Sequence, residues 1–484
     1  MEKFWKFVMH LLLLLQSSMF LTTDAFKILV FYPTPSLSHQ RPIMALTERL
    51  VQKGHELFVV SPNAVPVSNI HSDLFEFLKT LRVISEKIKF DVVIAESYSI
   101  PYTCAISRML SNGTPLISMT TFSADFGVQK RISNIPHFSF VPTLMSDYTD
   151  RMSLWQKIEN WLSYKYLSWR MEGQMMKAAR RFIRDAYGNE SERLVDGCWE
   201  SVSLSLVTSN SLYYYPRLLG PNIIETGPLH LKTPAKLPKN LKEWLDGAEK
   251  GVIYFSLGSN MKAKSLPIQV RANFLRMFDE LPDGYRVLWK SEEINEPVKK
   301  PHNILMQAWV PQDSVLAHPK VKLFITQGGL QSFQEAVHFG VPMVGIPLFV
   351  DQGCQVSKVV DAKIGVRLSP RDLHSFEIIK TAVESVLYDE SYQRNIRKLS
   401  EISRDLSSVA LDKATFWVEH VARHGGAAHL RPSIADANLI QYFCLDVISI
   451  FTAVLLVISF ILFKVCESVT GRVSNFPVAK VKKF

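Results

Sequence analysis

The sequence predicts an α/β protein with two facing domains of strand–helix repeats and one membrane-spanning helix after them. Three observations support this class. From residue 26 onward, apolar β-branched runs of strand length alternate with helical stretches, a pattern typical of parallel sheets covered by helices. Residues 231–240 are rich in proline and lysine, and this linker divides the pattern into two halves. Residues 443–463 form a nearly uninterrupted apolar run.

The composition narrows the class of protein. The 484 residues suffice for two or three domains, and 47% hydrophobic with 21% charged residues is globular in character. The formal charge of +10 comes from lysines and arginines spread along the sequence. We see neither zinc-ligand spacing nor an RNA-binding signature, so we expect no nucleic-acid partner and no metal site. The five cysteines are odd in number and far apart. We expect isolated buried thiols, with one disulfide as the alternative.

Residues 1–25 have the layout of a secretory signal peptide. Lys3 and Lys6 precede an apolar run at 8–15, and a small residue stands just before the expected cleavage point. An uncleaved membrane anchor is the alternative. The secretory pathway would also make two glycosylation sequons usable. These sequons begin at Asn112 and Asn189.

The first domain begins with an apolar strand at 26–32, which leads through a proline-punctuated loop into a helix. His39 lies in that loop, at the carboxyl end of the strand, where a doubly wound sheet binds its ligands. A buried strand at 91–95 is followed directly by Glu96. A carboxylate there can orient the imidazole of His39, and Asp125 in a later loop is the alternative partner.

Residues 136–187 carry large apolar side chains at helical spacing. One face of this expected helix comprises Trp155, Ile158, Trp161, Leu162, Tyr166 and Trp169. We expect most of this face to pack on the sheet. The alternatives for part of it are an acceptor pocket and contact with a membrane surface.

The second domain contains a strand at 321–326, the pair Gly328 and Gly329, and a helix at 330–338. The N-terminus of a helix leaves backbone N–H groups unpaired, and glycines let a ligand approach closely. The arrangement is therefore suited to a diphosphate.

Two further strands of this domain end in small or polar residues. The first strand runs into Gly258 and Ser259, and the strand after the helix leads into Asp351 and Gln352. Because parallel strands bring their carboxyl ends to one edge of the sheet, we expect these residues to face the same ligand.

The stretch 309–352 resembles the donor-binding signature of the UDP-glycosyltransferases, in particular the membrane-bound insect members. The residues that carry this match are Trp309, Pro311, Gln312, His318, Pro319, Gly328, Gly329, Ser332, Glu335, Gly340, Pro342, Pro347, Asp351 and Gln352. The resemblance implies the GT-B architecture of two facing Rossmann-like domains, and a UDP-sugar as co-substrate with no further cofactor.

The resemblance also implies a donor site. It comprises Gly258, Ser259, Trp309, Val310, Gln312, Gln327, Gly328, Gly329, Ser332, Glu335, Asp351 and Gln352. In it, Trp309 would stack on uracil, Gln312 would bond the uracil edge, and Glu335 would hold the ribose hydroxyls. Ser332 and the helix N-terminus would take the phosphates, while Asp351 and Gln352 would hold the sugar.

The family's general base is a His in the loop that matches His39, and Glu96 stands where the family usually has Asp. Two donor-site positions also depart from the pattern, with Gln327 in place of His and Gln355 in place of Asn. Gln327 can donate a hydrogen bond to a phosphate but carries no charge, so weaker donor binding is expected. The first domain is shortened near 61–72, which puts its third strand in question.

The C-terminal run 443–463 approaches the length needed to cross a bilayer. The basic residues of 464–484 place that tail in the cytosol and the domains in the lumen. The last five residues resemble the K-x-K-x-x retrieval signal of the endoplasmic reticulum.

We divide the chain into a signal peptide (1–25), an acceptor-binding domain (26–230), a linker (231–240), a UDP-sugar-binding domain (241–435), a transmembrane helix (443–463) and a basic tail (464–484). We expect a single-pass inverting glycosyltransferase of the endoplasmic reticulum that moves a hexose, glucose first, to a hydroxyl of a small lipophilic acceptor, as in detoxification. The alternatives are a low-turnover UDP-sugar-binding protein and a sphingolipid-directed hexosyltransferase. A nicotinamide-dependent enzyme fits less well, because no G-x-G-x-x-G follows either leading strand. A homo-oligomer is left open.

Overall fold

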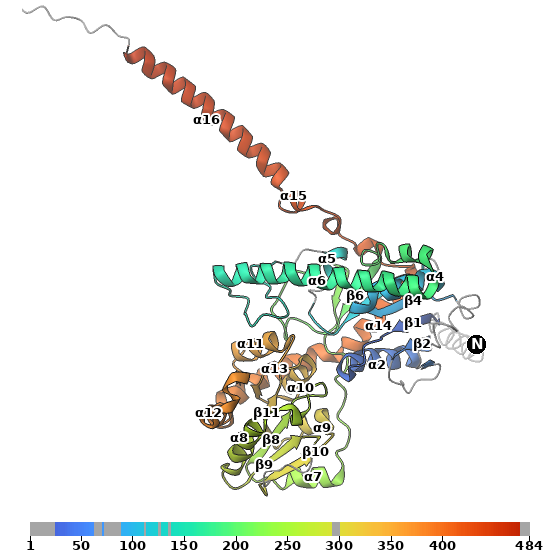
Figure 1. Ribbon diagram of the computed structural model, residues 1–484, viewed down its shortest axis with the longest axis vertical. Coiled ribbons are helices and arrows are strands. Elements are labelled where there is room, and N and C mark those ends of the chain that lie inside the picture. Colours follow the sequence, from blue (N-terminus) through green and yellow to red (C-terminus); the bar gives the residue numbers. More distant parts are fainter. Residues whose placement is uncertain are drawn as a thin grey trace, which may run out of the picture. The chain divides into compact units, whose positions relative to one another are not determined.

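The computed structural model describes residues 25–61, 70–71, 89–110, 113–123, 127–133, 137–292 and 301–474. Residues 1–24, Asn112, Asp125 and 475–484 lie outside this description, and so do the predictions made for them. Contacts divide the chain into two compact units, Met1–Arg431 and Pro432–Phe484. The first unit holds two parallel β-sheets with helices packed on them (Figure 1). The predicted α/β fold class is confirmed.

The first sheet has seven strands in the order β3-β2-β1-β4-β5-β6-β7, all parallel. Their bounds are β1 Lys27–Phe31, β2 Glu56–Val60, β3 Ile70–His71, β4 Val92–Glu96, β5 Leu116–Thr120, β6 Val202–Val207 and β7 Ile223–Glu225. The strand order reverses between β1 and β4. In an open parallel sheet this switch point is where ligands bind.

Helices cover both faces of this sheet because side chains alternate along each strand. The helices are α2 Leu37–Gln52, α4 Ile100–Leu110, α5 Val128–Ile132, α6 Leu154–Tyr187 and α14 Ala410–His424. Ile28 and Val30 of β1 share one apolar core with α2 and α14. Leu29 and Phe31 share the other with α4 and α6. The long α6 is the teal helix that runs along the first sheet in Figure 1.

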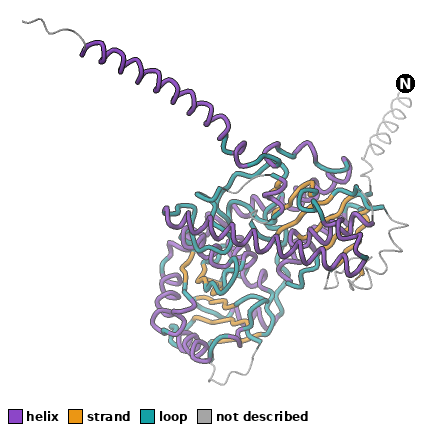
Figure 2. Tube along the Cα trace, turned by 45° about the horizontal axis from the view of Figure 1, so that its top comes forward, coloured by secondary structure: helices purple, strands orange, loops and turns teal. Residues whose placement is uncertain are grey.

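The second sheet has six parallel strands in the order β10-β9-β8-β11-β12-β13. Their bounds are β8 Gly251–Ser256, β9 Tyr285–Lys290, β10 Ile304–Gln307, β11 Val321–Thr326, β12 Met343–Gly345 and β13 Gly365–Arg367. Its helices are α7 Lys239–Asp246, α8 Ile268–Asp279, α9 Gln312–Leu316, α10 Leu330–Phe339, α11 Gln352–Asp361, α12 Phe376–Tyr388 and α13 Glu390–Ser408. Figure 2 shows the strands of both sheets, in orange, among the helices, in purple. The switch point here lies between β8 and β11.

The third strand of the first sheet, which the sequence put in question, is present as two residues. Ile70 pairs with Val59 and His71 pairs with Val60, in parallel register. The shortened segment therefore still adds a strand at the edge of the sheet.

The helix α14 lies in the predicted 241–435 domain but packs on the first sheet. Its residues Ala410, Ala414, Val418 and Val421 join the core that contains Ile28. These positions recur every three or four residues and form one helical face. The chain thus returns to the first sheet after completing the second sheet. The predicted division at residue 435 had assigned this helix to the second domain. Figure 1 shows α14, in orange, beside the blue elements β1 and α2.

Two other expectations were wrong. Cys104 and Cys198 form a disulfide, so they are not isolated thiols. The expected buried face of α6 is instead exposed, with Trp155 72% and Trp169 75% accessible. Periodicity identified a helical face in this segment but did not identify what covers it.

The second unit contains α15 Leu439–Tyr442 and α16 Leu445–Ser474. Residues Leu445–Ser468 of α16 are long and apolar enough to cross a membrane, with none of the apolar window buried. The run predicted at 443–463 lies largely within this helix. The predicted linker is without helix or strand from 231 to 238, and α7 begins at Lys239.

Candidate active site

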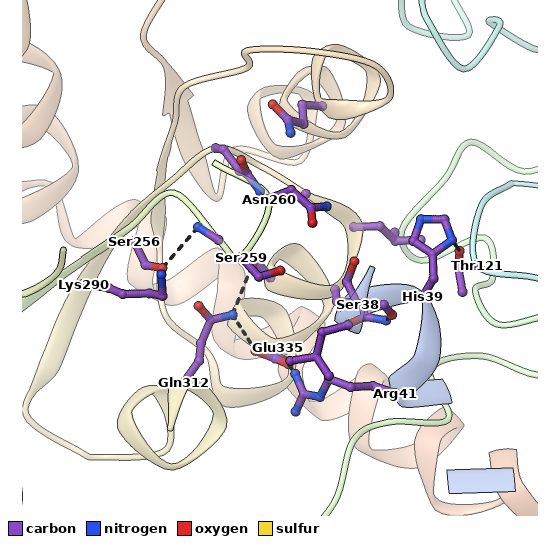
Figure 3. Close-up of a pocket in the computed structure, with 18 of the residues that line it drawn as sticks. Ser38, His39, Arg41, Thr121, Ser256, Ser259, Asn260, Lys290, Gln312 and Glu335 are labelled. Atoms are coloured by element: carbon purple, nitrogen blue, oxygen red, sulfur yellow. Dashed lines mark hydrogen bonds and ion pairs between the residues drawn. The ribbon is translucent and has the colours of Figure 1, made fainter. Parts of the chain in front are cut away.

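The carboxyl ends of the two sheets enclose a cavity of about 440 Å³. Strand ends and the first turns of α2, α9, α10 and α11 supply its wall. Polar lining residues include Ser38, His39, Arg41, Thr121, Ser256, Ser259, Asn260, Lys290, Gln312, Gln327, Ser332, Glu335, Asp351 and Gln352. Figure 3 shows that Ser38, His39 and Arg41 reach the cavity from one short stretch at the start of α2.

His39 is paired with Glu96, as the sequence predicted. The Nδ1 atom of His39 lies 2.9 Å from Oε1 of Glu96, which is only 1% exposed. The second carboxylate oxygen of Glu96 accepts a hydrogen bond from Thr34. His39 stands in the first turn of α2, which begins at Leu37, and not in the preceding loop. A carboxylate on Nδ1 favours the tautomer with a proton there, which leaves Nε2 able to accept one.

Glu335 is fully buried and holds several polar groups together. Its Oε1 accepts a hydrogen bond from Arg41 at 2.6 Å, and its Oε2 accepts one from Gln312 at 2.7 Å. The ring of His230 lies 3.5 Å from Oε1. Burial alone would raise the pKa of Glu335, but His230, Arg41 and Gln312 together hold the pKa at about 2. The group is therefore a permanent anion at neutral pH, with partners from both halves of the unit (Figure 3).

The glycine turns bring two backbone segments close to Gln327. A Cβ atom on Gly258, whose φ is +78°, would lie 2.4 Å from the Gln327 Nε2. The Gln327 side chain is buried, and its Oε1 has no hydrogen-bond partner among the described residues. The N-terminus of α10 follows at once, with Gly329 at its cap. This end of the cavity therefore combines a helix N-terminus with an amide side chain.

The loop before α11 carries Asp351 and Gln352. Its Val350 has a φ of 55°, a conformation that is strained for a β-branched residue and that is found mostly at functional sites. The Oε1 of Gln352 accepts hydrogen bonds from the N–H groups of Leu348 and Phe349, at 2.8 and 3.1 Å. Asp351 is 8% exposed, and its burial raises its pKa to about 6.

Gln355, the residue that replaces Asn in the resemblance, is fully buried. Its Nε2 donates to the hydroxyl of Tyr214 at 2.7 Å, and its side chain also stabilises the ionised form of Asp351. Tyr214 belongs to the segment after β6, so the bond joins the two halves of the unit.

The structure brings nearly all predicted site residues together. Glu96 stands behind His39, and Gly328 does not line the cavity. A Cβ on Gly328, with φ +80°, would lie 2.4 Å from Val356, which explains this glycine by packing. Trp309 lines the cavity and is 61% exposed, while Val310 is buried.

Sequence reasoning missed Arg41, Asn260 and Lys290. Lys290 is the last residue of β9, so the rule that ligands meet strand ends could have found it. Arg41 lies two residues after His39 at the same helix start. Asn260 lies two residues beyond Gly258, in the same turn, and exchanges hydrogen bonds with Ser36 of the other half.

Comparison with known proteins gives a consistent result. Residues 69–480 match the family model described as UDP-glucoronosyl and UDP-glucosyl transferase. UDP-glucosyltransferase 2 of Dactylopius coccus is 31% identical, over 98% of this chain and 99% of that protein. UDP-glucuronosyltransferase 2B18 of Macaca fascicularis is 33% identical, over 79% of this chain and 70% of that protein.

Solved structures agree at the level of the fold. The glycotransferase of kitacinnamycin has a TM-score of 0.56 at 19% identity, covering 82% of this chain and 98% of that one. A UDP-glucosyltransferase from Polygonum tinctorium has a TM-score of 0.56 at 16% identity, covering 83% of this chain and 100% of that one. These similarities show the GT-B fold.

Proposed function

The chain belongs to the family of UDP-glucuronosyl and UDP-glucosyl transferases, which move a sugar from a UDP-sugar to an acceptor, and we propose that this member transfers glucose, with inversion, to a hydroxyl of a small lipophilic molecule. The name of the Dactylopius coccus relative supports glucose. An apolar cavity of about 270 Å³ beside Glu96 supports a lipophilic acceptor. Its wall includes Phe31, Tyr98, Tyr102, Ile106 and Phe182.

The observation that carries the proposal is the contact between His39 and Glu96. With Nδ1 engaged by the carboxylate, the Nε2 of His39 takes the proton from the acceptor hydroxyl as its oxygen attacks the anomeric carbon. The bond from that carbon to the diphosphate oxygen breaks, and UDP leaves with the electron pair. Glu96 stabilises the imidazolium that forms.

The second sheet holds the donor. Trp309 stacks on uracil, and Gln312 and Glu335 bind the uridine. The N-terminus of α10, with Gly329 and Gln327, receives the charge that develops on the diphosphate. Asp351 and Gln352 bind the sugar hydroxyls. Arg41 donates a hydrogen bond to one oxygen of Glu335, so it must move or share that oxygen when ribose binds.

The decisive experiment replaces His39. His39→Ala should lower turnover by about 10²- to 10⁴-fold, the usual contribution of a general base, and leave UDP affinity nearly unchanged. Thr121→Val is the matched control, because Thr121 also contacts Nδ1, at 3.2 Å, yet has no charge to stabilise the imidazolium. Assays should offer several UDP-sugars with phenols and steroids. Equal losses of turnover and UDP binding in His39→Ala would indicate a structural role instead.

We also propose that α16 spans the endoplasmic reticulum membrane once, with both sheets in the lumen. The Cys104–Cys198 disulfide supports an oxidising compartment. Asn189 is exposed and accessible to glycosylation. An endoglycosidase should therefore increase electrophoretic mobility, and Asn189→Gln should remove at least part of that change. Protease outside intact microsomes should remove only the C-terminal tail, and a protected tail would contradict this topology.

A further inference from the structure

The first half of α6 presents a wide apolar face to solvent. The exposed large side chains are Leu154, Trp155, Ile158, Trp161, Leu162, Tyr166 and Trp169. They recur at spacings of three and four residues, so they lie on one side of the helix. None of the chemistry described above uses this face. Exposed apolar patches of this kind mark contact with another molecule or with a membrane.

The opposite side of the same helix half already holds it to the protein. Asn160 is fully buried, and its Oδ1 accepts a hydrogen bond from the Thr143 N–H at 2.7 Å. Its Nδ2 donates to the carbonyls of Phe138 and Val141, each at 2.9 Å. Tyr164, one turn further, is 7% exposed. The helix orientation is therefore fixed, and the apolar face cannot be buried by rotating the helix.

Three cations of α6 lie over exposed aromatic rings, two of them on this face and one, Phe140, in the segment before the helix. Lys157 lies over Phe140 at 5.7 Å, Lys165 over Trp161 at 5.6 Å, and Arg170 over Tyr166 at 5.9 Å from the ring centroid. Tryptophan and tyrosine with flanking lysine and arginine are typical of helices that lie in the interface of a bilayer. Long cationic side chains can bury their stems there and keep the charge in water.

We propose that this face of α6 lies on the surface of the lipid bilayer. A membrane is the partner of choice because the same chain carries α16, whose exposed apolar segment Leu445–Ser468 is long enough to span one. Because α16 would anchor the chain, the apolar face of α6 would be at high effective concentration near the membrane. Even a weak affinity of this face for the bilayer surface would then suffice for contact. The inference rests on the proposed membrane anchorage and adds a second, peripheral contact to it.

The test uses the full chain in phosphatidylcholine vesicles at no more than one copy per vesicle. The exposed Cys444 and Cys466 are first replaced by serine, since the remaining cysteines are buried or paired. The environment-sensitive dye NBD is then attached at Ile158→Cys, on the apolar face, or at Gln174→Cys. Gln174 is the matched control because it is exposed on the same helix but outside that face.

NBD at position 158 should emit at shorter wavelength than at 174, and a shallow spin-labelled lipid should quench it several-fold more strongly. Equal spectra and equal quenching would overturn the proposal. A signal at 158 that appears only when vesicles carry many copies would also overturn it, in favour of contact between chains. Failure of the anchorage is distinguishable, because the protein would then not float with the vesicles at all.

The unlabelled protein provides a second measurement that does not depend on labelling. Brominated lipid should quench part of its tryptophan fluorescence, and replacing Trp155 and Trp169 with serine should reduce that part, leaving the share of Trp161. Trp417→Phe is the control, since Trp417 belongs to α14. Unchanged quenching in the Trp155 and Trp169 variant would count against docking.

Discussion

Replacing Asp351 by Asn should make the protein more stable at neutral pH while weakening its hold on the donor sugar. Asp351 lies in the cavity, is 8% exposed, and has a pKa raised to about 6 by its burial. The folded protein therefore binds a proton at this carboxyl more tightly than the unfolded chain does. Folding then opposes ionisation at pH 7, whereas the proposed sugar-binding role of Asp351 requires the carboxylate.

The magnitude follows from the two pKa values. An unperturbed Asp has a pKa of about 3.9, so a folded value of about 6 costs about 3 kcal/mol of unfolding free energy at pH 7. Below pH 4 the carboxyl is protonated in the folded protein and the full stability is present. The cost develops as the pH rises from about 4 to 6. Asp351→Asn removes the titration, and it should raise the melting temperature by a few degrees at pH 7.5 and by almost nothing at pH 4.

The assay is thermal unfolding of the purified full chain, with and without UDP, between pH 4 and 7.5. Glu335→Gln is the control and should lower the melting temperature instead of raising it. The pKa of Glu335 is held at about 2, so its ionised form stabilises the fold over this whole pH range. The affinity of Asp351→Asn for UDP-glucose should fall by about ten- to a hundredfold, the value of a hydrogen bond to a charged group, with UDP affinity unchanged. A variant that is less stable than the parent at pH 7.5 would refute the reasoning.

Three further predictions concern single interactions. Gln327→His places an imidazole beside the N-terminus of α10. It should raise turnover by about ten- to a hundredfold, because a charge-assisted bond can strengthen as the diphosphate leaves. Single-turnover kinetics with UDP-glucose check this, and unchanged turnover means that Gln327 does not limit the rate. Tyr214→Phe removes the 2.7 Å bond to Gln355 and should weaken UDP-glucose binding by about three- to tenfold but spare UDP, as calorimetry would show. Replacing Cys104 and Cys198 with serine should cost about 2 to 4 kcal/mol of stability, and the wild-type chain should titrate three free thiols when denatured without reductant.

The parts of the site that the sequence predicts are those that parallel-sheet geometry determines. His39 follows the first strand and Glu96 ends β4, the two strands that flank the switch point. Strand ends on either side of that point must converge, so a His and a carboxylate placed there meet without knowledge of the loops. Gly258 and Asp351 are positioned by the same rule in the second sheet.

What the sequence could not predict depends on contacts between distant segments. Cys104 and Cys198 are 94 residues apart, and spacing alone does not reveal such a pair. The face of α6 has the period of a packed helix, yet no other element covers it in the described chain. Arg41 was overlooked because its partner, Glu335, lies 294 residues away on the opposite half.

The two departures from the family pattern can now be separated. The extra methylene of Gln355 reaches Tyr214 on the other half and stabilises the ionised Asp351, so this change is accommodated by a partner and should support sugar binding. The buried Oε1 atoms of both glutamines lack a hydrogen-bond partner in the described part of the chain, so the difference lies in the Nε2 atoms. The Nε2 of Gln355 donates to Tyr214, whereas the Nε2 of Gln327 lies against Gly258, at the end of the cavity beside the N-terminus of α10. An unpaired buried acceptor costs stability unless a ligand or water satisfies it. A diphosphate has no hydrogen to donate to such an oxygen, but it can accept a hydrogen bond from the Nε2 of Gln327. We therefore expect substitutions at position 327 to change turnover more than substitutions at position 355.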